Sequence, residues 1–242
     1  MRNKRLRKKE NYSLFQGYKE TWEFLKESKY YLLSVILVFC IFFAIGFFVP
    51  IPELVMNMIK EWISQVLKET EGLGFFGMWW FIFSNNLSIA FLAIFLGLFF
   101  GLFPALSLAF NAYFVGAVTS MVVEKTNITE VWRLLPHGIF ELPAIFISFA
   151  VGIRLGIDLM INCLLFYKKE LPRIPLSIYV IICLLFFPII FLIILILTIL
   201  NKSLRNKLSF NFFNSIRVFI FIIIPLLLIA SFIEAGLIVF LK

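Results

Sequence analysis

The chain has 242 residues, of which 62% are hydrophobic, and its mean hydropathy is +1.01. Soluble domains are closer to half apolar, whereas this sequence contains apolar runs of about 20 residues, the length that crosses a bilayer. A soluble domain is therefore excluded, and the short alternating segments of a membrane β-barrel are absent from the sequence. The net charge of +8 indicates membrane topology and attraction to anionic lipid headgroups, not a nucleic-acid partner.

We predict an all-α protein, a polytopic transmembrane helix bundle of five or six spans with interfacial amphipathic helices. Residues 1–30 are expected to form a basic cytoplasmic arm and an amphipathic helix, and residues 31–242 a single transmembrane domain. A second amphipathic stretch, 51–70, carries too many charges to cross and is predicted to be an interfacial helix on the outer surface. The expected spans are 31–49, 79–103, 105–123, 137–157, 176–200 and 218–241.

Two topologies fit this pattern. In the six-span version both termini are cytoplasmic, and residues 201–217 form a basic loop outside. In the five-span version residues 137–157 are re-entrant and the C-terminus lies outside, since irregular backbone at membrane depth must be sheltered by protein or water. The distribution of Lys and Arg favours six spans only slightly. Both versions describe a multi-pass protein of the cell membrane with a cytoplasmic N-terminus.

The sequence around the only histidine marks a candidate site. His137 stands four residues before Glu141, so both side chains point to the same side of a helix. Pro136 suits the first helical turn, whereas Pro143 predicts a kink, a break or a late helix start. Ionisable groups at membrane depth are costly and indicate function. A pair at the water interface, bonded to each other or to nearby backbone, explains the same residues without a function.

Few polar side chains interrupt the predicted spans. They either hydrogen-bond neighbouring helices, line a hydrated path for protons, ions or a polar substrate, or bind a metal. One His and one Glu are too few for a zinc site, so we predict no metal and no cofactor. The predicted functional polar core consists of Asn85, Asn86, Asn111, His137, Glu141, Arg154 and Glu234.

Small residues recur four apart within the spans, a pattern that allows close helix packing. We expect Gly97 and Gly152 to face other helices instead of lipid. The predicted packing positions are Gly97, Gly101, Gly116, Gly138, Gly152 and Gly156.

The depths of two charged residues predict an ion pair. In the six-span version Arg154 and Glu234 reach a similar depth near the inner leaflet, where either charge alone is costly, and we expect them to pair. In the five-span version Glu234 approaches His137 and Glu141 instead.

The sequence carries no motif of an established catalytic mechanism. Gly-x-Ser-x-Gly, His-Glu-x-x-His and Walker sequences are absent, and nothing visibly activates the hydroxyl of Ser84 as a nucleophile. We therefore predict no catalytic residue and no enzymatic activity.

The polar and small residues together resemble the core of the stage II sporulation protein M family. The resemblance covers roughly residues 75–157 and 225–242, and it rests on Leu134-Leu135-Pro136-His137-Gly138, Glu141-Leu142-Pro143-Ala144, Gly152, Gly156, Asn85-Asn86, Asn111, Gly116 and the stretch from Ile229 to Ala235. It implies an integral membrane scaffold, because in sporulating bacteria the founding member anchors a complex with two peptidoglycan-remodelling proteins during engulfment.

We therefore expect a non-catalytic integral membrane scaffold or assembly factor for membrane or envelope remodelling. Its expected partners are membrane lipids and other membrane or envelope proteins, with a homo-oligomer as a further option and no nucleic acid. The alternative is a transporter or channel whose polar intramembrane path runs through His137, Glu141 and Glu234.

Overall fold

The computed structural model describes residues 14–125, 135–166 and 175–240. Within these ranges, the side chains of residues 14, 15, 125, 135–139, 176, 179, 180, 183, 184 and 187 lie outside that description. Every regular element in these ranges is a helix, which confirms the predicted fold class. Within the described ranges, five helical stretches are long and apolar enough to cross a membrane: Lys29–Phe48, Phe75–Leu98, Leu102–Glu124, Phe140–Phe166 and Lys202–Phe240.

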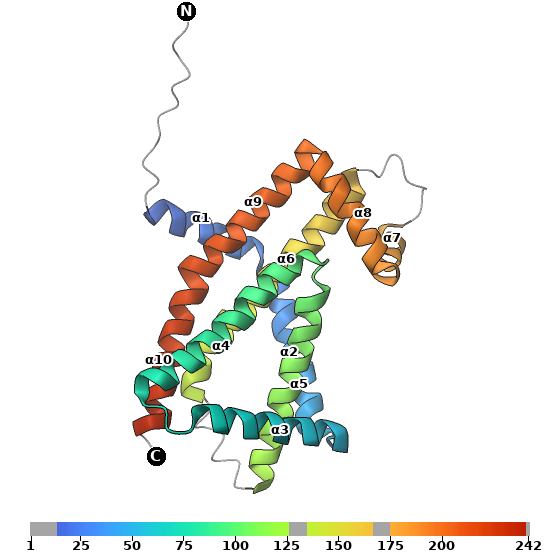
Figure 1. The fold of residues 1–242 in the computed structure, drawn as a ribbon. Helices are drawn as coiled ribbons and strands as arrows, with labels where there is room; N and C mark the ends of the chain where they lie inside the picture. The colour runs from blue at the N-terminus through green and yellow to red at the C-terminus, as the bar shows by residue number, and fades with distance from the viewer. Residues whose placement is uncertain (1–13, 126–134, 167–174, 241–242) are drawn as a thin grey trace, which may run out of the picture.

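The helices form a bundle whose spans are joined by connections of different length: a tight turn links η1 to α5, whereas α3 lies between α2 and α4, and α7 and α8 lie between α6 and α9 (Figure 1). Helices α9, η3 and α10 continue into one another without a break in Figure 1, and η3 is a π-helical turn. In chain order the elements are α1 (Leu14–Glu27), α2 (Lys29–Phe48), α3 (Glu53–Thr70), α4 (Phe75–Phe95), η1 (Leu96–Leu98), α5 (Leu102–Lys125), α6 (Leu135–Phe166), α7 (Leu176–Leu185), α8 (Phe187–Leu200), α9 (Lys202–Val218), η3 (Phe219–Ile223) and α10 (Ile224–Phe240).

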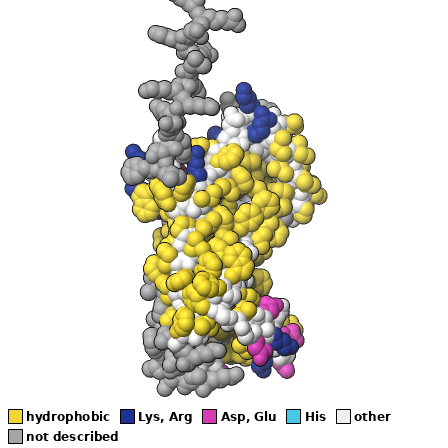
Figure 2. Space-filling model, turned by 60° about the vertical axis from the view of Figure 1, so that its left-hand side comes forward, with side chains coloured by type: hydrophobic (Ala, Val, Ile, Leu, Met, Phe, Trp, Pro, Cys, Tyr) yellow, Lys and Arg dark blue, Asp and Glu magenta, His cyan; other side chains and the backbone are white. Residues whose placement is uncertain are grey.

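Two amphipathic helices lie at opposite ends of the bundle (Figure 1). The α1 end holds α1, the start of α2, the end of α6 and the start of α9. The α3 end holds α3, the end of α2 and the end of α10. Figure 2 shows hydrophobic side chains covering the body of the molecule between charged groups at the two ends.

Exposed tyrosine and tryptophan side chains, which combine an aromatic ring with a polar atom, lie at both the α1 end and the α3 end of the bundle. Tyr18, Trp22 and Tyr30 are exposed at the α1 end, and Trp62 and Trp80 are exposed toward the α3 end. Trp and Tyr are enriched where a bilayer meets water, so the two groups bracket the apolar body in the way expected of a membrane protein.

Basic side chains are distributed unequally between the two ends. The α3 end of the described chain holds Lys60, Lys68 and Lys125, whereas the α1 end holds Lys19, Lys26, Lys29, Arg154, Lys202, Arg205, Lys207 and Arg217.

Glycines bring α4–η1 directly against α6. Gly97 lies against the backbone of Gly152, and Gly156 lies against the backbone of Gly97 and Gly101. A Cβ atom at Gly97, Gly152 or Gly156 would overlap backbone atoms, which cannot move aside as the end of a flexible side chain can. Buried apolar side chains continue the same contact toward the α3 end: Ala90, Ile94, Ala144, Ile147 and Val151.

A second glycine contact joins α2 and α5. Gly46 lies against the carbonyl group of Tyr113, and Gly116 lies against the carbonyl group of Phe43. Helices in lipid gain nothing from hiding apolar surface from each other, so close backbone approach of this kind is what holds them together. Gly46 has no small residue four positions away, which is why the spacing pattern did not reveal it.

The turn between η1 and α5 is unusually tight. Phe100 and Gly101 both have positive φ angles, +55° and +72°. The Gly101 N–H donates to the Gly97 carbonyl at 2.8 Å, which links this turn to the α4–α6 contact. Pro104 lies in the first turn of α5, where its missing N–H costs nothing.

Three local predictions differ from the structure. Residues 176–200 are interrupted at Phe186, just before Pro188, and form helices of 10 and 14 residues instead of one span. Residues 201–217, expected as a loop, form α9, whose first N–H groups are capped by the side chain of Asn201. Helix α6 continues through Pro143, so residues 137–157 are not a re-entrant break.

We predict that alanine at Gly97 or Gly152 lowers the melting temperature of the detergent-solubilised protein. The added Cβ would force the two backbones apart, and overpacking of this kind costs about 1–3 kcal/mol. Gly74→Ala is the matched control, because no atom lies within 4 Å of a Cβ built at that position. Unchanged melting of both Gly97→Ala and Gly152→Ala would show that the close contact does not exist in solution.

Candidate functional site

The structure separates the predicted polar core into two clusters and two exposed positions. The first cluster joins three helices. Glu141 of α6 and Glu234 of α10 are close enough to interact electrostatically, and Asn86 of α4 offers a side-chain hydrogen bond to Glu141. Asn86 is buried and both carboxyl groups are partly buried. We call these three residues the carboxylate cluster.

The carboxylate cluster has a specific chemical capacity. Two carboxylates that lie near each other and away from bulk water repel when both are ionised, so such a pair favours binding a proton or a cation. The Asn86 amide can donate a hydrogen bond to Glu141 in its ionised form. His137 lies one helical turn before Glu141 in α6, and its side chain lies outside the described residues.

The second cluster is built around Arg154 near the end of α6. Its Nη1 donates to the backbone carbonyl of Phe24 at 2.8 Å and to the hydroxyl of Ser28 at 2.7 Å. Its Nη2 forms an ion pair with Glu27 at 2.9 Å, and its Nε lies 3.4 Å from Asp158. The guanidinium carbon also lies 4.0 Å from the centre of the Phe24 ring. Arg154 therefore ties the end of α1 to α6, and we call this group the Arg154 cluster.

The Arg154 cluster follows from simple electrostatics. A lone guanidinium near membrane depth is costly, and its planar set of donors is suited to several acceptors at once. The last turn of α1 and Ser28, which follows it, supply a backbone carbonyl, a carboxylate and a hydroxyl within a few residues. The Phe24 carbonyl accepts from the N–H and the hydroxyl of Ser28 as well as from Arg154. A second ion pair joins α1 to α9: Arg217 of α9 lies 2.7 Å from Glu20, in the first half of α1.

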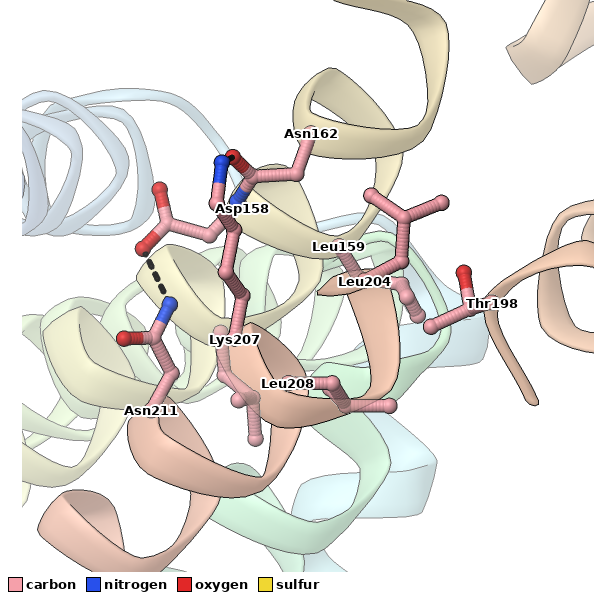
Figure 3. A pocket seen from close by; sticks show the side chains of 9 residues that line it. Asp158, Leu159, Asn162, Thr198, Leu204, Lys207, Leu208 and Asn211 are labelled. Atoms are coloured by element: carbon pink, nitrogen blue, oxygen red, sulfur yellow. Dashed lines mark hydrogen bonds between the residues drawn. The ribbon is translucent and has the colours of Figure 1, made fainter. Parts of the chain in front are cut away.

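The ends of α6 and α9 meet beside the Arg154 cluster. Asn211 donates to Asp158 at 3.0 Å, and Lys207 Nζ lies 3.4 Å from Asn162 Oδ1 (Figure 3). The side chains drawn in Figure 3 surround a cavity of about 10 Å³, which has room for one water molecule. The buried hydroxyl of Thr198, which lines this cavity, has no hydrogen-bond partner within the described residues.

Two predicted core residues point away from the bundle. Asn85 of α4 and Asn111 of α5 are exposed, although each lies near the middle of its helix. Asn111 donates to the backbone carbonyl of Ser107 at 2.8 Å and to its hydroxyl at 3.2 Å. These amides do not contribute to either cluster.

The predicted pairing of Arg154 with Glu234 is wrong. Arg154 belongs to the α1 end and bonds to Glu27 and Asp158, whereas Glu234 lies with Glu141 toward the α3 end. The prediction assumed that both helices enter from the same side, but α10 runs antiparallel to α6. Sequence reasoning missed three acceptors: Glu27 at the end of α1, Ser28 between α1 and α2, and Asp158 one turn beyond Arg154. The i, i+4 spacing of Asp158 was the available signal.

We predict that Arg154→Gln destabilises the protein far more than Glu27→Gln. Hydrogen bonds to a charged group contribute about 1.5–3 kcal/mol each, and Arg154 makes several. The side chain of Glu27 is 67% exposed, and exposed ion pairs contribute about 0–1 kcal/mol. Thermal melting in detergent measures the difference, and limited proteolysis should cleave α1 faster in Arg154→Gln. Equal effects of the two substitutions would refute the assigned role of Arg154.

We predict that Glu234→Gln raises the melting temperature at pH 8 but not at pH 5. At the higher pH the substitution removes repulsion between two ionised carboxylates, a term on the order of 1 kcal/mol or more. At the lower pH the protonated carboxyl and the amide are both neutral. Glu71→Gln, at an exposed position, should change neither value. A stabilisation that is the same at both pH values would contradict the proximity of Glu234 to Glu141.

Comparison with known proteins identifies the family. No curated protein and no solved structure matched the chain. The model of the family described as Stage II sporulation protein M matches residues 35–237. Apart from a few terminal residues, this range includes the five apolar helices found in the described part of the chain. It also includes the carboxylate cluster and, from the Arg154 cluster, Arg154 and Asp158, but not the α1 end of that cluster. This match extends well beyond the two regions that carried the resemblance in the sequence. The chain therefore belongs to the stage II sporulation protein M family.

Proposed function

We propose that the protein is a non-catalytic membrane scaffold or assembly factor for envelope remodelling, with α1 on the cytoplasmic side of the cell membrane. Its membership of the family and its five apolar helices support a membrane role. The concentration of basic residues at the α1 end supports the orientation, because Lys and Arg near span ends favour the cytoplasm.

The observation that carries the scaffold proposal is the exposure of Asn85 and Asn111. Each amide lies near the middle of a spanning helix, on a surface that would otherwise face acyl chains. Side-chain hydrogen bonds between membrane helices contribute on the order of 1 kcal/mol each, and an amide that faces hydrocarbon lacks them. The bonds described for Asn111 both go to Ser107 of its own helix. These two positions are therefore suited to contact with helices of a partner protein.

The Arg154 cluster supports the same proposal. Its donors are used to hold an amphipathic helix across the α1 end of the bundle. A rigidly held surface of this kind gives cytoplasmic or membrane partners a fixed place to bind.

The alternative function, a transporter or channel, is favoured by one observation, the carboxylate cluster. Carboxylates inside a bundle are typical of proton and cation pathways. That function requires a hydrated path from the cluster to both ends of the bundle. The cavity of about 10 Å³ lies elsewhere, between α6, α8 and α9, and holds one water at most.

We predict that Asn85→Leu and Asn111→Leu reduce co-purification of partner proteins without lowering stability. Leucine has a similar size but cannot form a hydrogen bond across a helix interface. The full chain is purified from native membranes under mild detergent, and the bound proteins are identified by mass spectrometry. Phe110→Leu, at a neighbouring exposed apolar position, is the control. The proposal fails if both asparagine variants recover the same partners in the same amounts as the unaltered protein.

A further inference from the structure

The end of α6 and the start of α9 lie side by side. Two side-chain contacts hold them together, Asn211 to Asp158 at 3.0 Å and Lys207 to Asn162 at 3.4 Å (Figure 3). The segments that precede and follow α7 and α8 therefore lie at the same end of the bundle, the α1 end.

Helices α7 and α8, which occupy this part of the chain, are too short to cross. They have 10 and 14 residues. At 1.5 Å per residue they measure about 15 and 21 Å, against about 30 Å for the hydrocarbon core. In Figure 1 both lie beside the α1 end, far from α3.

Helix α8 has two different apolar faces. One face packs on the bundle: Phe191 stacks on Phe99 with ring centres 4.6 Å apart, and Phe191 and Ile194 belong to a buried cluster with Leu159. The other face is open, with Ile189 65%, Leu192 56% and Ile196 54% exposed. Residues 176–200 contain no charged side chain.

A basic segment follows this apolar one directly. Lys202 and Arg205 are exposed in the first turns of α9, and Arg205 donates to the carbonyl of Ile199 at the end of α8 at 2.9 Å. An uncharged apolar face bordered by basic residues matches acyl chains bordered by anionic headgroups. The open face of α8 therefore has a chemical match in the leaflet at the α1 end, and the charges beside it select anionic lipid.

We propose that α7 and α8 form a re-entrant element, which enters and leaves the leaflet at the α1 end, and that Lys202 and Arg205 bind anionic phospholipid headgroups beside it. The occupant of the open face of α8 is the acyl region of that leaflet. This site goes beyond the scaffold function and stands independently of it.

Depth-dependent fluorescence quenching tests the position of α8. Ile193→Cys and Ser203→Cys are made in a chain whose cysteines are replaced by alanine, labelled with bimane and reconstituted into phosphatidylcholine vesicles. Brominated phosphatidylcholine should quench the label at position 193 severalfold more than the label at 203, because Ile193 lies on the open face and Ser203 lies in the polar start of α9. Quenching of both labels by aqueous iodide alone would overturn the proposal.

The side of the membrane on which the two ends of the α7–α8 element are accessible gives a second, independent test. Ser177→Cys and Ser203→Cys, at the two ends of the element, should react with a membrane-impermeant maleimide from the same side of the vesicle. Reaction from opposite sides would mean that residues 176–200 cross, and would overturn the re-entrant arrangement. Concentration-dependent cross-linking through Ile193→Cys, with no quenching by lipid, would assign the open face to a second copy of the chain and overturn lipid as its occupant.

The binding of anionic headgroups by Lys202 and Arg205 is tested by comparing two quenchers, brominated phosphatidylglycerol and brominated phosphatidylcholine, at the same mole fraction. The anionic lipid should quench the label at position 193 more strongly, because Lys202 and Arg205 enrich it locally. Combined Lys202→Gln and Arg205→Gln substitutions should bring the ratio of the two quenching efficiencies close to one. Combined Lys60→Gln and Lys68→Gln substitutions, at the α3 end, should leave the ratio unchanged. Equal quenching by both lipids in the unaltered chain would overturn headgroup binding.

Discussion

The contact between the backbones of α4–η1 and α6 is the constraint on which the other elements depend. Gly97, Gly152 and Gly156 have no side chain to separate the two helices, so their peptide groups meet directly. Lipid tails are as apolar as leucine, and tight packing therefore replaces hydrophobic burial as the force that joins helices. Helix α10 packs along both α4 and α6, and the positive-φ turn at Phe100 and Gly101 starts α5 from the same point.

Polar side chains have three separate tasks in this arrangement. Arg154 and Arg217 fasten the amphipathic helix α1 across one end of the bundle. The carboxylate cluster joins α4, α6 and α10 toward the opposite end. Asn85 and Asn111 face outward from the middle of their helices. Only the second of these resembles the interior of a transport protein. The first attaches α1 within the chain, and for the third we propose contact with other chains.

Much of this fold was readable from the sequence because its signals are local. Apolar run length gave the spanning helices, and four-residue glycine spacing pointed to Gly97, Gly101, Gly152 and Gly156, which lie at the α4–α6 contact. The proximity of Glu234 to Glu141 was expected only in the five-span version, because it depends on the relative direction of α6 and α10, and local signals did not decide that direction. The approach of Asn86 to Glu141 was not foreseen, for the same reason. The pairing assigned to Arg154 failed for the same reason.

The uncharged stretch 176–200 shows how composition can mislead. By hydropathy it equals a span, yet Pro188 removes a backbone donor and the helix is interrupted at Phe186. For residues 201–217 the error was the opposite one. Their charges indicated a loop, but they form a helix whose first N–H groups are capped by Asn201. In both stretches, a single residue with a particular backbone preference outweighed the average composition.

The central claim is that polar groups in this bundle hold helices and partners together and do not line a path through the membrane. Ion and proton flux into liposomes containing the purified protein tests this claim most directly, measured with a pH-sensitive dye and with Na⁺ or K⁺ gradients. We expect flux equal to that of protein-free liposomes, for the unaltered chain and for Glu141→Gln alike. Flux above this background that disappears in a stably folded Glu141→Gln protein would contradict it.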